Sequence, residues 1–319
     1  MKQIRCALLG VFALGSVAGF ADTPPSQPIT AEQSRSRPVA MEKAEQWTMR
    51  SKVGRIFEIS MALPSGPAPG QGYPVMYVLD PSTAFATLVD TVRNQEQMFG
   101  PVVVVGVGYA SDAEGENRSY DLTPITDPKD LPAGPPAGWG GDHGGNDAFL
   151  SFIVDELKPA VAKAVAVDPS RQALFGHSLG GLFVLHTLFS RSDAFDTYIA
   201  GSPSIWWGKK SILREVPAFK SVQEKSRVPR RLLITVGELE AFASPEEIRL
   251  GAALKVDANK LMVDAKQVAY SAELARELSS LTGFGLKVQR VAFSDETHNS
   301  VIPAYLARGA RFTLLGWFQ

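Results

Sequence analysis

The segment Leu174-Phe175-Gly176-His177-Ser178-Leu179-Gly180-Gly181 carries the strongest structural signal in this sequence. The apolar run Ala173–Phe175 is typical of a buried strand, and the periodicity of Leu179–Phe189 predicts a helix. A serine between them must adopt a strained turn, in which flanking glycines remove side chains that would collide. The segment therefore predicts an exposed nucleophile, Ser178, beside the amide of Leu179, which can bind developing negative charge at the start of the helix.

Strands and helices alternate along the rest of the chain. Further strands are expected at Val75–Leu79, Val102–Val107, Leu232–Val236 and Leu286–Phe293, and further helices at Ala84–Met98, Asn146–Val165, Asp257–Leu281 and Val301–Phe318. Strands that are apolar on both faces are typical of a parallel sheet covered by helices. The stretches Gln46–Ser51 and Arg55–Leu63 predict an antiparallel N-terminal hairpin. With the nucleophile turn, this order predicts an α/β-hydrolase fold, a mostly parallel central sheet flanked by helices.

The N-terminus reads as an export signal. Lys2 and Arg5 precede an apolar run that ends in small residues, so we expect residues 1–21 to be a signal peptide cleaved after Ala21, with a membrane anchor as the alternative. Residues 22–44 are rich in Pro, Ser, Thr and Gln and are expected to form a flexible leader. Residues 45–319 are expected to form a single domain, in which the irregular stretches 111–145 and 242–256 are candidate functional loops.

Bulk composition excludes several classes of protein. A hydrophobic content of 45% over 319 residues excludes a disordered or fibrous chain, and a formal charge of -1 gives no electrostatic footprint for nucleic acid. Cys6, the one cysteine, lies in the expected signal peptide, so the exported chain would have no disulfide, thiol nucleophile or thiolate metal site. We expect no metal or organic cofactor, no nucleic-acid partner and no stable membrane insertion after cleavage. The predicted location is the periplasm.

The order nucleophile, acid, histidine restricts the choice of the catalytic base. Of the four histidines, His143 and His177 precede the nucleophile, and His186 lies eight residues along the following helix. His298 remains, between the last expected strand and the terminal helix, where this architecture places its base. We therefore predict that His298 accepts the proton of Ser178.

The acid and the second oxyanion donor are less constrained. The strand Leu232–Val236 is followed by Glu238 and Glu240, and Glu240 is the first choice to orient the base, with Glu238 and Asp295 as alternatives. The second oxyanion donor is expected after Asp80, but Pro81 has no amide hydrogen. Ser82 is therefore the candidate.

Several motifs occur together in this order. They are Val78-Leu79-Asp80, Asn117-Arg118-Ser119-Tyr120-Asp121-Leu122-Thr123-Pro124, Gly144-Gly145-Asn146-Asp147-Ala148-Phe149, the nucleophile segment, Ser202-Pro203-Ser204-Ile205-Trp206-Trp207 and Gly237-Glu238-Leu239-Glu240. This set, over residues 45–318, resembles the esterase-D-like "putative esterase" family of α/β-hydrolases, and within it the periplasmic esterases that hydrolyse enterobactin-type siderophore trilactones.

The resemblance implies a function and further site residues. It implies hydrolysis of the ester bonds of a catecholate siderophore, ferric or free, by Ser178 and His298, either as a dyad or with an acid, and it maps a substrate-binding arginine onto Arg118. Such a flat, anionic small-molecule substrate also suits stacking on Trp139, Trp206 or Trp207. The alternatives are a carboxylesterase for feruloyl or acetyl esters and a non-catalytic siderophore-binding relative.

Overall fold

The computed structural model describes residues 40–110, 114–131, 142–253 and 256–318. Residues 42–319 form one compact unit. This unit begins at Glu42, a little before the expected boundary at Glu45, because the amide of Leu63 donates a 2.9 Å hydrogen bond to the carbonyl of Lys43. The expected signal peptide and the leader up to residue 39 lie outside the described residues, so both stay predictions.

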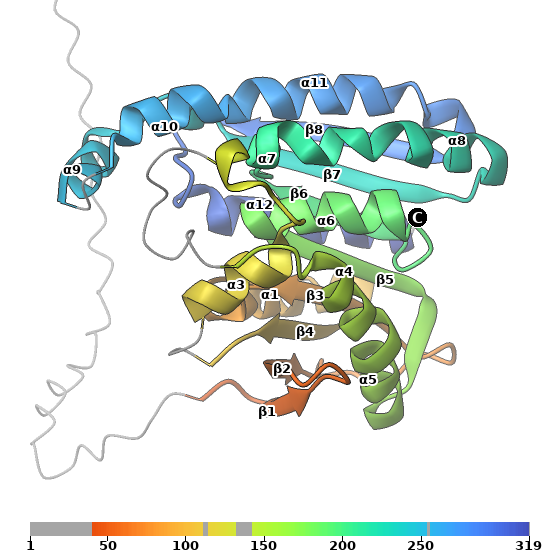
Figure 1. Ribbon diagram of the computed structural model, residues 1–319. Coiled ribbons are helices and arrows are strands. Elements are labelled where there is room, and N and C mark those ends of the chain that lie inside the picture. Colours follow the sequence, from red (N-terminus) through yellow and green to blue (C-terminus); the bar gives the residue numbers. More distant parts are fainter. Residues whose placement is uncertain (1–39, 111–113, 132–141, 254–255, 319) are drawn as a thin grey trace, which may run out of the picture. The chain divides into compact units, whose positions relative to one another are not determined.

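A sheet of eight strands runs through this unit, in the order β1-β2-β4-β3-β5-β6-β7-β8 (Figure 1). The strands are β1 Ala44–Arg50, β2 Ile56–Ala62, β3 Tyr73–Leu79, β4 Val103–Gly108, β5 Val167–His177, β6 Thr197–Gly201, β7 Arg230–Gly237 and β8 Leu286–Phe293. β2 is antiparallel to β1 and β4, and all other pairs are parallel. The predicted fold is thus confirmed, although β6 was not predicted from the sequence.

Helices cover both faces of the sheet. They are α1 Pro81–Arg93, α2 Glu96–Phe99, α3 Glu114–Leu122, α4 Asn146–Phe152, α5 Lys158–Ala164, α6 Leu179–Ser190, α7 Trp207–Lys210, α8 Val216–Ser226, α9 Pro245–Ala253, α10 Ala258–Ala265, α11 Gln267–Ser279 and α12 Val301–Trp317. One face packs against α4, α6, α8 and α11, and the other against α1 and α12, which contact each other (Figure 1). No helix in the described ranges is long and apolar enough to cross a membrane.

Two stretches expected to be irregular contain helices. α3 lies within residues 111–145 and α9 within residues 242–256, so both expectations were wrong for these segments. The single helix expected at residues 257–281 is interrupted at Lys266, whose backbone is left-handed with φ 45°. Polar, glycine-containing composition favours a loop locally, and contacts with the rest of the fold override that preference.

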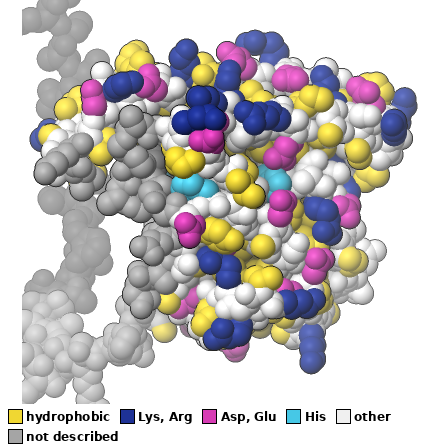
Figure 2. All heavy atoms as spheres, in the orientation of Figure 1, with side chains coloured by type: hydrophobic (Ala, Val, Ile, Leu, Met, Phe, Trp, Pro, Cys, Tyr) yellow, Lys and Arg dark blue, Asp and Glu magenta, His cyan; other side chains and the backbone are white. Residues whose placement is uncertain are grey.

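The central strands β3, β4, β6 and β7 are largely buried and apolar on both faces, as the apolar runs of β3, β4 and β7 predicted, whereas the edge strands β1 and β8 also carry exposed polar side chains. Tyr77 and Leu79 face the helices of one layer, and the intervening Val78 is also fully buried. Since the carboxyl ends of parallel strands meet at one edge of a sheet, the segments that follow β3, β5, β7 and β8 come together there. On the outer surface, acidic and basic side chains are interspersed over the face that Figure 2 shows.

Candidate active site

Ser178 occupies a strained turn between β5 and α6. Its backbone has φ 60° and ψ -117°, and its amide donates a 2.9 Å hydrogen bond to the carbonyl of Gly201 on the neighbouring strand. A Cβ atom on Gly176 would lie 2.3 Å from the carbonyl oxygen of Gly180, so only glycine fits at that position. The turn therefore holds the serine at the carboxyl edge of the sheet, as the sequence predicts.

His298 reaches Ser178 from the segment between β8 and α12. Its Nε2 lies 3.0 Å from Ser178 Oγ, across 120 residues of sequence. This distance is within the range of a hydrogen bond from a serine hydroxyl to an imidazole. The structure thus brings the predicted nucleophile and the predicted base into direct contact.

Glu240 completes the constellation from the short helix Glu238–Ala241 after β7. Its Oε2 lies 2.8 Å from His298 Nδ1, and its side chain is buried. Its other oxygen accepts hydrogen bonds from Ser202 Oγ at 2.5 Å and from the amide of Gly237 at 2.7 Å. The two alternatives, Glu238 and Asp295, are exposed. Of the candidate acids, Glu240 is therefore the one that orients the imidazole.

Two buried aromatic groups stand behind the base. The ring of His177 lies 4.6 Å from that of His298 and 5.6 Å from that of Tyr305, measured between centroids. Burial lowers the pKa of His177 well below its usual value, and the neighbouring His298 imidazole and Arg118 guanidinium lower it further. His177 is thus a neutral packing partner at neutral pH.

The oxyanion side of the site involves two helix N-termini. Leu179 is the first residue of α6, so its amide has no acceptor within the helix. Asp80, in a left-handed conformation, precedes α1, and the pocket wall there consists of Asp80, Thr83 and Ala84. Ser82 is exposed in the first turn of α1, and its role as second donor stays a prediction.

The residues predicted to contact substrate differ in their exposure and in their partners. Trp207 is 1% exposed and donates a hydrogen bond to Thr126 Oγ1, so the expectation that it stacks on a substrate was wrong. Trp206 is half-buried against Trp207, and Trp139 lies outside the described residues. Arg118 lines the pocket, but its guanidinium binds Asp80 rather than standing open to solvent.

Two serines of the site were not predicted from the sequence. Ser202 fixes the acid, and Ser204 Oγ lies 3.4 Å from Ser178 Oγ. Both belong to the motif Ser202–Trp207, but no role was predicted for either serine. Their position after the unrecognised strand β6, at the same sheet edge as the nucleophile, is the signal that could have found them.

The geometry defines a class of enzyme. A pocket of about 260 Å³ opens beside Ser178, and its wall includes His298, Arg118 and Ile302. An activated serine, a base and a buried orienting carboxylate are the groups needed for acyl transfer to water. Among the described residues, no cluster of acidic, His or Cys side chains could hold a metal ion. The site is that of a serine hydrolase on an α/β-hydrolase fold.

Comparison with known proteins gives the family. The chain belongs to the "Putative esterase" family, whose model matches residues 51–270. The ferri-bacillibactin esterase BesA of Bacillus subtilis is 37% identical over 266 residues, covering 82% of this chain and 85% of the relative. The siderophore enterobactin esterase of Emericella nidulans is 33% identical, covering 86% and 95%. The structure of siderophore hydrolase EstA from Aspergillus nidulans has a TM-score of 0.75 at 31% identity, covering 88% and 97%. The chain is a carboxylic ester hydrolase, and its resemblance to this family is confirmed.

Proposed function

We propose that the protein is a siderophore esterase that hydrolyses the ester bonds of a catecholate trilactone of the enterobactin type and so helps to release iron. The observation that carries this proposal is the hydrogen-bonded series Ser178, His298 and Glu240 in a chain whose relatives are named as siderophore esterases. Hydrolysis converts one chelating macrocycle into separate, weaker ligands. Loss of this preorganisation weakens the hold on the metal.

The geometry supports a two-step reaction. Ser178 Oγ forms a bond to the ester carbonyl carbon while its proton passes to His298 Nε2, and the amide of Leu179 binds the resulting oxyanion. Collapse breaks the ester C–O bond, and His298 returns the proton to the departing alkoxide. Water then attacks the acyl carbon while His298 takes its proton. The bond between Ser178 Oγ and the acyl carbon breaks, and His298 returns the proton to Ser178 Oγ, which releases the carboxylic acid. Glu240 stabilises the imidazolium in both steps.

The pocket size bears on how the substrate enters. Its volume of about 260 Å³ lies just below the range of roughly 300–1,000 Å³ that is typical for sites that enclose a whole drug-sized ligand. We infer that one ester with its attached arm enters at a time while the remainder of the macrocycle stays outside. Linear trimer, dimer and monomer would then appear in succession.

A product profile tests the proposal. Purified protein is incubated with free enterobactin, with its ferric complex and with methyl ferulate, and the products are followed by liquid chromatography and mass spectrometry. We expect successive cleavage of the trilactone by the protein and none by Ser178→Ala. Turnover of methyl ferulate with an intact trilactone would refute the siderophore proposal and favour the carboxylesterase alternative. A folded protein that binds enterobactin, cleaves neither substrate and resists labelling of Ser178 by a phosphonate would favour the non-catalytic relative.

We also propose that the protein acts in the periplasm after export. The basic and apolar N-terminal segment with small residues before Asp22 supports this location. The intact mass of the protein recovered from the periplasmic fraction should correspond to a chain that begins at Asp22. Retention of residues 1–21 in the membrane fraction would indicate an anchor instead.

A further inference from the structure

Arg118 makes a bidentate ion pair with Asp80 at the edge of the catalytic pocket. Its Nε lies 2.7 Å from Asp80 Oδ1 and its Nη2 lies 2.9 Å from Oδ2, so the two planar groups face each other. Nη2 also lies 3.3 Å from the carbonyl oxygen of His177, next to the nucleophile. Arg118 thus connects the turn after β3 to the turn after β5.

Asp80 has an unusual backbone and a sensitive position. It is left-handed, with φ 53° and ψ 58°, and its carbonyl accepts hydrogen bonds from the amides of Thr83 and Ala84. This conformation is uncommon for residues other than glycine, although Asp and Asn adopt it more readily than most, so contacts around Asp80 help to hold it. A Cβ atom placed on Gly180 would lie only 3.3 Å from Asp80 Oδ2, so the carboxylate lies against the first turn of α6.

The carboxylate of Asp80 is thus close to where negative charge develops during ester hydrolysis. The first turn of α6 supplies the amide of Leu179, the expected oxyanion donor. An unpaired carboxylate beside this turn would repel the oxyanion and compete for the same amides. The guanidinium of Arg118 cancels that charge while it fixes the left-handed turn.

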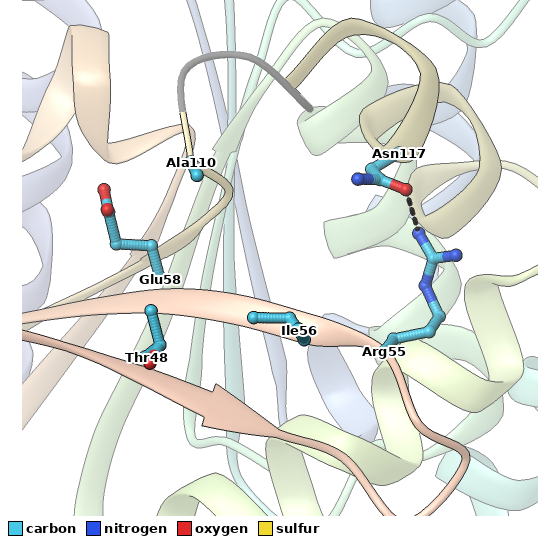
Figure 3. A pocket seen from close by; sticks show the side chains of 6 residues that line it. All are labelled: Thr48, Arg55, Ile56, Glu58, Ala110 and Asn117. Carbon is cyan, nitrogen blue, oxygen red and sulfur yellow. Dashed lines mark hydrogen bonds between the residues drawn. The ribbon is translucent and has the colours of Figure 1, made fainter.

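The helix that carries Arg118 is itself anchored by the segment that leads into β2. Asp121, three residues further along α3, is fully buried and binds the guanidinium of Arg55, which precedes β2. Arg55 also donates a 2.9 Å hydrogen bond to Asn117, beside a pocket of about 340 Å³ (Figure 3). The N-terminal hairpin thereby holds α3, and α3 presents Arg118 to Asp80.

We propose that Arg118 is a positioning residue that acts through Asp80, holding the turn after β3 and neutralising a carboxylate beside the oxyanion site, rather than a direct contact for an anionic substrate. This inference rests on the ester hydrolysis of the proposed function but not on the siderophore as substrate. It assigns to the Arg118–Asp80 pair an effect on every ester, charged or not.

A neutral ester separates the two roles of Arg118. With p-nitrophenyl acetate, we expect Arg118→Ala to lower kcat about a hundredfold and to change KM by less than about twofold, because transition-state stabilisation is lost and substrate binding is not. Arg118→Lys keeps the charge but not the bidentate geometry, so its kcat should lie between those of the wild type and Arg118→Ala. Full activity of Arg118→Ala on p-nitrophenyl acetate, with a raised KM for the siderophore alone, would overturn the proposal.

A double-mutant cycle tests whether Arg118 acts through Asp80. Asp80→Asn removes the carboxylate charge and places at this position a residue that tolerates the left-handed conformation. We expect Arg118→Ala to cost less than about threefold in the Asp80→Asn background, where no charge is left to neutralise. A cost that is the same in both backgrounds would show that Arg118 acts independently and would refute the proposal. If Arg118→Ala does not fold, Arg118→Lys completes the same cycle.

Arg171→Ala is the matched control. Arg171 pairs with Asp168 at 2.6 Å, and these side chains are 19% and 2% exposed, compared with 22% and 12% for Arg118 and Asp80. Arg171 lies six residues before His177 on β5, toward the opposite end of that strand from Ser178. We expect Arg171→Ala to lower Tm by about as much as Arg118→Ala does and to leave kcat unchanged. An equal loss of kcat in this control would show that the effect at Arg118 is general destabilisation and would overturn the proposal.

A wild-type protein that hydrolyses p-nitrophenyl acetate but not the trilactone would refute the siderophore substrate. The double-mutant cycle at Arg118 and Asp80 would still be interpretable in that case.

Discussion

His298 and His186 both bind carboxylates, yet their chemical consequences are opposite. His298 has a carboxylate on one ring nitrogen only, Glu240 at 2.8 Å, and its other nitrogen faces Ser178 Oγ at 3.0 Å. His186 has carboxylates on both sides, Glu215 at 3.0 Å from Nδ1 and Asp147 at 3.1 Å from Nε2.

The number of carboxylates decides what each imidazole can do. A carboxylate only accepts hydrogen bonds, so two carboxylates favour a hydrogen on both ring nitrogens of His186. This is the imidazolium, which has no lone pair left to accept a proton from a substrate. One carboxylate fixes the tautomer of His298 and leaves Nε2 as an acceptor directed at the serine. A catalytic base therefore needs a buried carboxylate on one side only. At His186 the two carboxylates instead make a structural link between α6, α4 and the start of α8.

The largest effect is expected from removing the acceptor itself. His298→Ala should lower kcat about 10⁵- to 10⁶-fold on any ester, and Ser178→Ala should do the same, with no further loss in the double variant, because the two residues act as a unit. Steady-state hydrolysis of p-nitrophenyl acetate measures this. The matched control, His186→Gln, should retain wild-type kcat. A comparable loss at His186 would contradict the contrast between the two sites.

The next effect tests the single carboxylate. Glu240→Gln keeps the shape of the side chain but removes the charge that stabilises the imidazolium, so we expect kcat to fall about ten-thousand-fold. Ser202→Ala removes one hydrogen bond to the same carboxylate while the amide of Gly237 remains, and should cost about tenfold. A loss below about tenfold for Glu240→Gln would show that the enzyme works as a Ser-His dyad.

The catalytic order could be predicted because it is encoded locally. A strand, a glycine-flanked serine and a helix specify the turn at Ser178, and chain order then leaves His298 as the one histidine in a suitable loop. The parallel strands could be predicted for a similar reason, because apolar runs buried on both faces differ from the alternating pattern of exposed sheets. β6 was missed because Thr197–Gly201 is short and contains Thr, Ala and Gly.

What could not be predicted depends on contacts between distant segments. Glu238 and Glu240 both follow the same strand, so the sequence could rank them but not decide between them. The turn after β7 decides, because it buries Glu240 and exposes Glu238. Arg118 was predicted to contact substrate because the family resemblance maps a substrate-binding arginine onto it, and an arginine can bind an anionic ligand. The partner that occupies it, Asp80, is 38 residues away and can be recognised only in the folded chain.

The smallest effect concerns stability at His186. Burial alone would lower the pKa of His186, but the hydrogen bonds and charges of Glu215 and Asp147 outweigh it, and the pKa is raised above its usual value. A raised folded-state pKa gives stabilisation that is fully present below the unfolded pKa of about 6.5 and is lost as pH rises through the folded value. His186→Gln should therefore lower the free energy of unfolding at acidic pH, and by less at alkaline pH, where His186 is neutral in wild type. The acidic effect should be only about 1 kcal/mol, because Asp147 is largely exposed and its contribution is screened. Urea unfolding of both proteins at about pH 5.5 and 8.5 measures the difference. A difference that grows toward alkaline pH would mean that His186 is neutral in the fold, and the contrast with His298 would then need another explanation than the second carboxylate.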